Sequence, residues 1–133
     1  MFARALSVCL ILLLLLSCAS TGVIKERTRY FERYTFDQVW EASLAALKDL
    51  NYEIMETARW RGFIYAERKN LPHSTLRLPL QLSVHIGEDE ELGWIKVDCE
   101  AILVGSKKDY SEVKRRTESQ FFTALRKRVK GKV

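Results

Sequence analysis

The sequence contains few of the residues from which catalytic and metal sites are most often built. Its 133 residues include only two histidines, His73 and His85, and three cysteines. A zinc site needs three or four convergent Cys, His or carboxylate ligands, and no such spacing is present. Gly-rich phosphate loops, GxSxG elbows and HExxH helices are also missing. We therefore predict that the protein is not an enzyme and that it holds no metal and no cofactor.

Long apolar runs are scarce as well, and the clearest one lies at the N-terminus. Residues 5–18 follow a single positive charge, Arg4, and end in small residues. A transmembrane helix needs roughly 20 apolar residues, so an uncleaved anchor is the less favoured alternative. The order of positive charge, apolar stretch and small residues is typical of a secretory signal peptide.

The apolar run closes with Leu15-Leu16-Ser17-Cys18, which resembles the lipobox of bacterial lipoproteins. The resemblance implies that residues 1–17 are removed and that Cys18 receives the lipid, palmitate included. Ala19 and Ser20 lack the acidic residue that commonly marks inner-membrane retention, so it also implies an outer-membrane anchor facing the periplasm. Cleavage of an ordinary signal peptide without lipidation is the alternative, since Leu16 is unusual at its position.

The cysteines of the exported chain cannot form an internal disulfide. Cys9 leaves with the signal peptide, Cys18 carries the lipid, and Cys99 remains alone. Cys99 lies in an alternating apolar pattern, which predicts a small buried side chain rather than a reactive thiol. Residues 18–27 form a tether whose nine residues after Cys18 reach about 30 Å at most, and residues 28–133 form one domain.

Hydrophobic periodicity predicts an α+β fold for this domain. Residues 28–34, 52–57, 63–68, 76–86 and 94–104 are predicted strands, and helices are predicted from Phe36 to about residue 50 and over residues 110–130. Thr35 and Gln38 have the spacing of a capping box, and Asn51 is a plausible left-handed stop. Pro79 indicates an edge position or an unpaired side of its strand. The strands each have one polar face, so we expect a single antiparallel sheet of four to five strands with two helices packed on one face, in the order β-α-β-β-β-β-α.

The pattern from Phe36 to Ala66 (FDQVWEA … L … LNYEI … GFIYA) is similar to small envelope lipoproteins with helix-grip domains of the BamC type. This resemblance covers about a third of the chain and implies a helix-grip-like α+β domain. It implies no catalytic activity. Asn51 stands where the family pattern often has glycine.

Two surface features remain as candidates for contact with a partner or a membrane. Arg59-Trp60-Arg61 lies at a predicted hairpin tip, where Trp60 either folds back onto a helix end or offers an aromatic contact. The last helix is predicted to present a basic face, which is either a solvated surface or attracted to anionic lipid. Its residues are Arg115, Arg116, Arg126, Lys127 and Lys130.

These features favour a non-enzymatic, lipid-anchored adaptor or accessory subunit of an envelope assembly, with an envelope protein as its partner. The alternative is a helix-grip binding module for an apolar ligand or for anionic lipid headgroups. The formal net charge of +5 suits anionic lipid or an acidic partner. The basic residues lack interleaved aromatics, so we expect no nucleic-acid binding. The oligomeric state is left open by the sequence.

Overall fold

Five antiparallel strands form one sheet in the computed structural model, which describes residues 27–68, 80–103 and 111–131. The strands are β1 (Thr28–Phe31), β2 (Glu53–Ala58), β3 (Phe63–Arg68), β4 (Leu80–Glu88) and β5 (Ile95–Leu103). They lie side by side in the order β1-β5-β4-β3-β2. With helices α2 (Phe36–Asp49) and α3 (Ser111–Lys130), the element order is β-α-β-β-β-β-α. The predicted α+β fold class is confirmed.

Local interactions set both ends of helix α2: a capping box at its start and a left-handed residue after its end. The Thr35 hydroxyl accepts the N–H of Gln38 at 3.2 Å, and the Gln38 side chain accepts the N–H of Thr35 at 2.9 Å, which completes the predicted capping box. Asn51 follows the helix with φ of 63°, in the left-handed region where Asn is tolerated. Val39, Trp40 and the fully buried Leu47 face the sheet, together with Ala42, Ser43 and Ala46.

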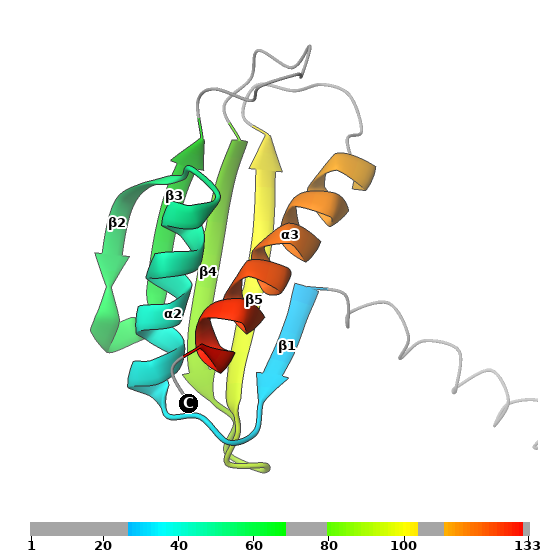
Figure 1. Ribbon diagram of the computed structural model, residues 1–133. Coiled ribbons are helices and arrows are strands. Elements are labelled where there is room, and N and C mark those ends of the chain that lie inside the picture. Colours follow the sequence, from blue (N-terminus) through cyan, green and yellow to red (C-terminus); the bar gives the residue numbers. More distant parts are fainter. Residues whose placement is uncertain (1–26, 69–79, 104–110, 132–133) are drawn as a thin grey trace, which may run out of the picture.

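Helix α3 runs across the same face of the sheet and packs against both α2 and β5. Figure 1 shows the two helices side by side in front of the sheet, with α3 lying diagonally across the direction of the strands. Phe121 and Leu125 are fully buried, as the helical periodicity predicts. Thr117, Glu118, Phe122 and Val129 are buried as well.

The hydrophobic core lies between the helices and one face of the sheet. Alternate residues of β4 and β5 point into it, which the period-two pattern of these strands predicts. The strand side chains that are buried there include Leu82, Val84, Val97, Cys99 and Ala101. The opposite face of the sheet carries the intervening, more polar residues, so it is the only broad face of the described sheet that helices leave uncovered.

Some strand boundaries differ from the prediction. Strand β1 ends at Phe31 rather than at residue 34, because the chain turns there toward the cap of α2. Strand β4 is described only from Leu80, so residues 76–79, with Pro79, lie outside the described residues. From Leu80 onward β4 pairs with β3 on one side and β5 on the other, so the described part of this strand is central in the sheet, and the predicted edge position or unpaired side at Pro79 lies outside the described residues. No helix among the described residues is long and apolar enough to cross a membrane.

Candidate interaction surfaces

The connection between β2 and β3 is a single 3-10 turn, Arg59–Arg61, which holds the Trp60 side chain out in solvent. Trp60 is 85% exposed, so the alternative in which it folds back onto a helix end is wrong. Gly62 ends the turn with φ of 66°, and a Cβ at this position would lie 1.8 Å from the carbonyl oxygen of Ile86. The turn therefore passes so close to β4 that only glycine fits.

The two arginines of the turn have different partners. Arg59 reaches back to α2 and forms an ion pair with Asp37. The Arg61 guanidinium lies 5.1 Å from the ring centroid of Trp60 and 5.7 Å from that of Phe63, within cation–π range. Of the three predicted contact residues here, Trp60 and Arg61 are thus presented to solvent together, while Arg59 fastens the turn to α2.

The sheet face away from the helices, here called the open face, has an aromatic centre. Phe63 and His85 lie directly opposite each other on β3 and β4, with ring centroids 5.0 Å apart. The His85 side chain is exposed on this face. At the far edge the rings of Tyr30 and Trp94 meet edge to face with centroids 6.3 Å apart. Aromatic and arginine side chains of this kind are enriched at protein interfaces.

The open face also carries an acidic ladder, defined as Glu53, Glu56 and Glu67. Glu53 lies directly opposite Glu67 across β2 and β3, and Glu56 lies opposite Tyr65. Like charges directly opposite each other destabilise a strand pair, and none of the three carboxylates forms an ion pair within the described parts of the chain. Partial desolvation, with a smaller contribution from the charge of Glu67, raises the pKa of Tyr65.

Helix α3 presents its basic residues on the side opposite the core. Arg115, Arg116, Arg126, Lys127 and Lys130 are all exposed there, which confirms the predicted basic face. Seven Lys and Arg against two Glu give α3 a formal charge of +5. Eight Lys and Arg against thirteen Asp and Glu give the other described residues −5. The described body is therefore electrically polarised, with its positive charge concentrated on one helix.

A groove runs along this helix and past the C-terminal end of α2. Leu50, Asn51, Gln120, Thr123 and Ala124 line it together with several charged residues. The basic residues that line it are Arg29, Arg68, Arg115, Arg116 and Lys127, and the acidic ones are Asp49 and Glu112. Besides the residues at and near the two helices, strands β1 and β3 contribute Arg29 and Arg68 to its lining.

Among the described residues that line this groove, Arg68 has a buried side-chain nitrogen that lacks a hydrogen-bond partner. Its guanidinium lies 6.0 Å from the Tyr52 ring centroid, and its Nε is buried without a hydrogen-bond partner. Burial raises the pKa of Tyr52 to about 12, so its hydroxyl stays protonated beside this guanidinium at neutral pH.

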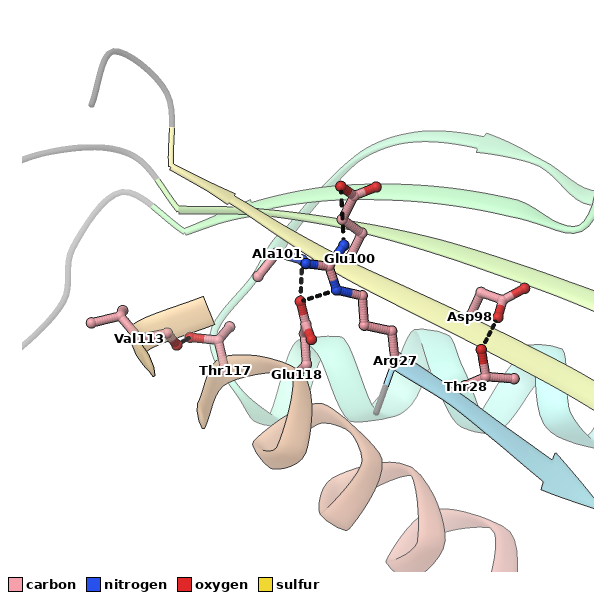
Figure 2. Close-up of polar contacts among 8 residues, drawn as sticks. All are labelled: Arg27, Thr28, Asp98, Glu100, Ala101, Val113, Thr117 and Glu118. Atoms are coloured by element: carbon pink, nitrogen blue, oxygen red, sulfur yellow. Dashed lines mark hydrogen bonds and ion pairs between the residues drawn. The ribbon is translucent and has the colours of Figure 1, made fainter. Parts of the chain in front are cut away.

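A buried carboxylate that the sequence analysis missed joins α3 to the sheet. Glu118 is only 3% exposed, and its Oε1 accepts the backbone N–H of Ala101 at 3.1 Å. The Arg27 guanidinium lies 3.7 Å from Glu118 and 3.6 Å from Glu100, bridging the two (Figure 2). Burial raises the pKa of Glu118. The helical spacing could have predicted this burial, because Glu118 precedes Phe121 by three residues and Phe122 by four and so lies on the same packed face of the helix.

The cysteine of the described chain lies in the core. Cys99 is 1% exposed, and burial raises the pKa of its thiol, which keeps it in the unreactive form. No group of three His, Cys, Asp or Glu in the described parts of the chain could hold a metal ion. His73 and the predicted lipidation residue Cys18 lie outside the described residues.

Comparison of the sequence with protein-family models and with curated proteins finds no match to either.

Proposed function

We propose that the protein is a non-enzymatic, lipid-anchored adaptor or accessory subunit of an envelope assembly, held by Cys18 in the outer membrane and facing the periplasm. The observation that carries the docking role is the open face. Both helices cover one side of the sheet. The other side presents two pairs of aromatic rings and the carboxylates of the acidic ladder, and the exposed Trp60 stands on the turn that joins β2 and β3. Contact with water alone accounts neither for the 85% exposure of Trp60 nor for the facing carboxylates of Glu53 and Glu67. A partner that covers this face would bury the aromatic surface and pair the charges.

The anchor and the docking face are tested separately. Several acyl chains on one cysteine hold a protein stably at a membrane, since each buried CH₂ contributes about 0.8 kcal/mol. Cys18→Ser should therefore release the protein from the membrane fraction or leave it unprocessed. Normal processing and full membrane retention of Cys18→Ser would overturn the lipoprotein part of the proposal.

The docking face is tested by site-specific photo-crosslinking in intact membranes. A crosslinker at His85, which is exposed at the centre of the open face, should give a discrete adduct with one envelope protein. A crosslinker at Lys48, exposed on α2 on the side of the sheet that the helices cover, is the matched control. Trp60→Ala should weaken the His85 adduct. Equal adducts from both positions, or an adduct indifferent to Trp60, would contradict docking at the open face.

A second candidate function is binding of anionic lipid headgroups, and the charge of α3 favours it. Each basic residue close to an anionic surface contributes about 1 kcal/mol, and the groove places Arg29 and Arg68 beside the basic residues of α3. The apolar-ligand alternative has less support, because the described side chains between sheet and helices are close to fully buried. The two remaining functions are compatible, since the open face and α3 lie on opposite sides of the sheet.

A further inference from the structure

The strand residues that share the open face with Phe63 and His85 are strongly acidic. Side chains alternate along a strand, and in the register of the described sheet five carboxylates and a single ammonium group take this side. Together they give the face a formal charge of −4. The residues concerned are Glu53, Glu56, Glu67, Asp98, Glu100 and Lys96.

These carboxylates form two groups. The acidic ladder lies on β2 and β3, and Asp98 and Glu100 form the second group on β5. The order β5-β4-β3-β2 and a spacing of about 4.8 Å between strands put the two groups about 10–14 Å apart across the sheet. His85 lies between them on β4. An elongated partner with two positive groups at this spacing would match the face.

Helix α3 carries positive charge at a similar spacing. The basic residues on its outer side, here called the basic stripe, fall within an arc of about 120° at 3.6 residues per turn. The stripe has an N-terminal group, Arg115 and Arg116, and a C-terminal group, Arg126, Lys127 and Lys130. The two groups are about 15 Å apart along the helix axis. The exposed residues between them carry no charge and are Ser119, Gln120 and Thr123.

One copy of the chain cannot bring these two surfaces together. Both helices cover one face of the sheet, and the open face is the other (Figure 1). The basic stripe and the acidic ladder of one molecule therefore lie on opposite sides of its sheet. The stripe of one molecule can meet only the open face of another.

We propose that the basic stripe of one copy docks across the open face of a second copy. This pairing rests on the proposed docking role of the open face and names its occupant. The helix crosses the strands, so that its C-terminal group lies over the acidic ladder and its N-terminal group lies over Asp98 and Glu100. The uncharged middle of the stripe covers His85.

Docking satisfies groups that a single copy leaves in conflict. The carboxylates of Glu53 and Glu67 face each other without an ion pair in the described parts of the chain, and in the docked pair each gains a cation. The long stems of the basic side chains pack on the rings of Phe63 and Tyr65. Because the contact is heterologous, copies join head to tail. The copy at the end of such a row keeps its stripe free for anionic lipid.

Charge exchange between two differently tagged full-length chains tests this pairing. The first chain carries a photo-crosslinker at His85, so an adduct that contains both tags shows a second copy on the open face. Arg126→Glu, Lys127→Glu and Lys130→Glu in the second chain should lower the yield of this adduct about tenfold or more, because like charges then face each other. Changing the acidic ladder of the first chain to Lys should do the same. When the two reversed chains are combined, opposite charges meet again and the adduct should return.

Two controls separate this pairing from changes in folding and in overall charge. Both reversed chains should keep a nearly unchanged melting temperature, since the replaced side chains are exposed or half-buried. Glu88→Lys, Glu90→Lys and Glu91→Lys in the first chain make the same change of charge at the turn after β4, away from the open face. This variant should leave the adduct intact.

The outcomes distinguish the occupant from the docking role. Failure of the combined reversed chains to restore the adduct would overturn the proposal, and so would an equal loss in the turn variant. An adduct with a different protein, and none with both tags, would also overturn it but would leave the docking role of the open face standing. No adduct at all from His85 would contradict the docking role itself.

Discussion

Arg128 on α3 holds the carboxylate of Asp49, the last residue of α2, through two hydrogen bonds. Its Nε lies 2.6 Å from Oδ2 of Asp49, and Nη2 binds Oδ1. A carboxylate at a helix C-terminus opposes the helix dipole, and the guanidinium offsets this cost. The pairing with Arg128 holds the pKa of Asp49 below its usual range and raises that of Arg128. Residues 79 positions apart thus join the two helices.

We expect the effects of substituting the two residues of this ion pair on the melting temperature to be non-additive. Asp49→Asn and Arg128→Gln should each lower the melting temperature, and the double variant should lose less than the sum of the two. Arg126→Gln, an exposed neighbour without this partner, is the control. The folded pKa of Asp49 is lowered, so the contribution of the pair is present above the unfolded pKa and is lost as the pH falls through the folded pKa. Additive effects of the two substitutions would show that the pair contributes nothing.

Alanine substitutions at Gly62 and Gly93 should distinguish the cost of a steric clash from the cost of a left-handed backbone. Both have positive φ, of 66° and 69°, but a Cβ on Gly62 would lie 1.8 Å from a carbonyl oxygen, whereas nothing lies within 4 Å of one on Gly93. Gly93→Ala should cost about 1 kcal/mol for its left-handed conformation. Gly62→Ala should cost clearly more, because β4 must move as well. Urea unfolding of the two variants measures the difference, and equal midpoints would mean that the Arg59–Arg61 turn relaxes freely.

Glu118 should make the stability of the domain depend on pH. Its folded pKa is raised by burial, so its contribution is fully present below the unfolded pKa of about 4.3 and is lost as the pH rises through the folded value. Glu118→Gln retains an acceptor for the Ala101 N–H but carries no charge. Relative to wild type, the variant should gain melting temperature as the pH rises above about 4. Glu100→Gln, at the exposed neighbouring position, should show no such gain.

Reversing the charge of basic residues on α3 should distinguish their contribution to stability from their contribution to binding. Arg126, Lys127 and Lys130 are exposed, so changing all three to Glu should leave the melting temperature nearly unchanged. If α3 binds anionic lipid, a chain of residues 19–133 with these changes should lose its sedimentation with anionic vesicles at low salt. The wild-type chain should lose the same binding at high salt, since screening acts over about 8 Å at physiological ionic strength. Unchanged binding of the reversed chain would show that this face is only a solvated surface.

The parts of the fold that follow from neighbouring residues were predictable from the sequence. The capping box of Thr35 and Gln38, the stop at Asn51 and the buried phase of α2 depend on contacts within a few residues. The same holds for the alternating faces of β4 and β5 and for the outward basic residues of α3. The candidate contact residues were correctly placed on the surface, but the pattern could not decide between the two conformations of Trp60.

Trp60 and Glu118 show why other features of the structure could not be predicted from the sequence. The orientation of Trp60 depends on how closely the turn passes β4 at Gly62 and on the Arg61 guanidinium that stacks on the ring. Glu118 is charged, and charged residues are rarely buried without a partner. Its burial follows from an unpaired backbone N–H on β5 that becomes its partner only once β1 stops short.

The sequence by itself determined the order of helices and strands, the residues that each turns toward the core, and the concentration of basic side chains on the last helix. These depend on periodicity and on capping chemistry, which act over at most two helical turns. Only the tertiary structure decided that β1 lies beside β5, that Asp49 meets Arg128, and that Glu118 closes the edge of the sheet. Each of these contacts joins segments far apart in the chain, and the free energy that selects them comes from burying the helices against one face of the sheet.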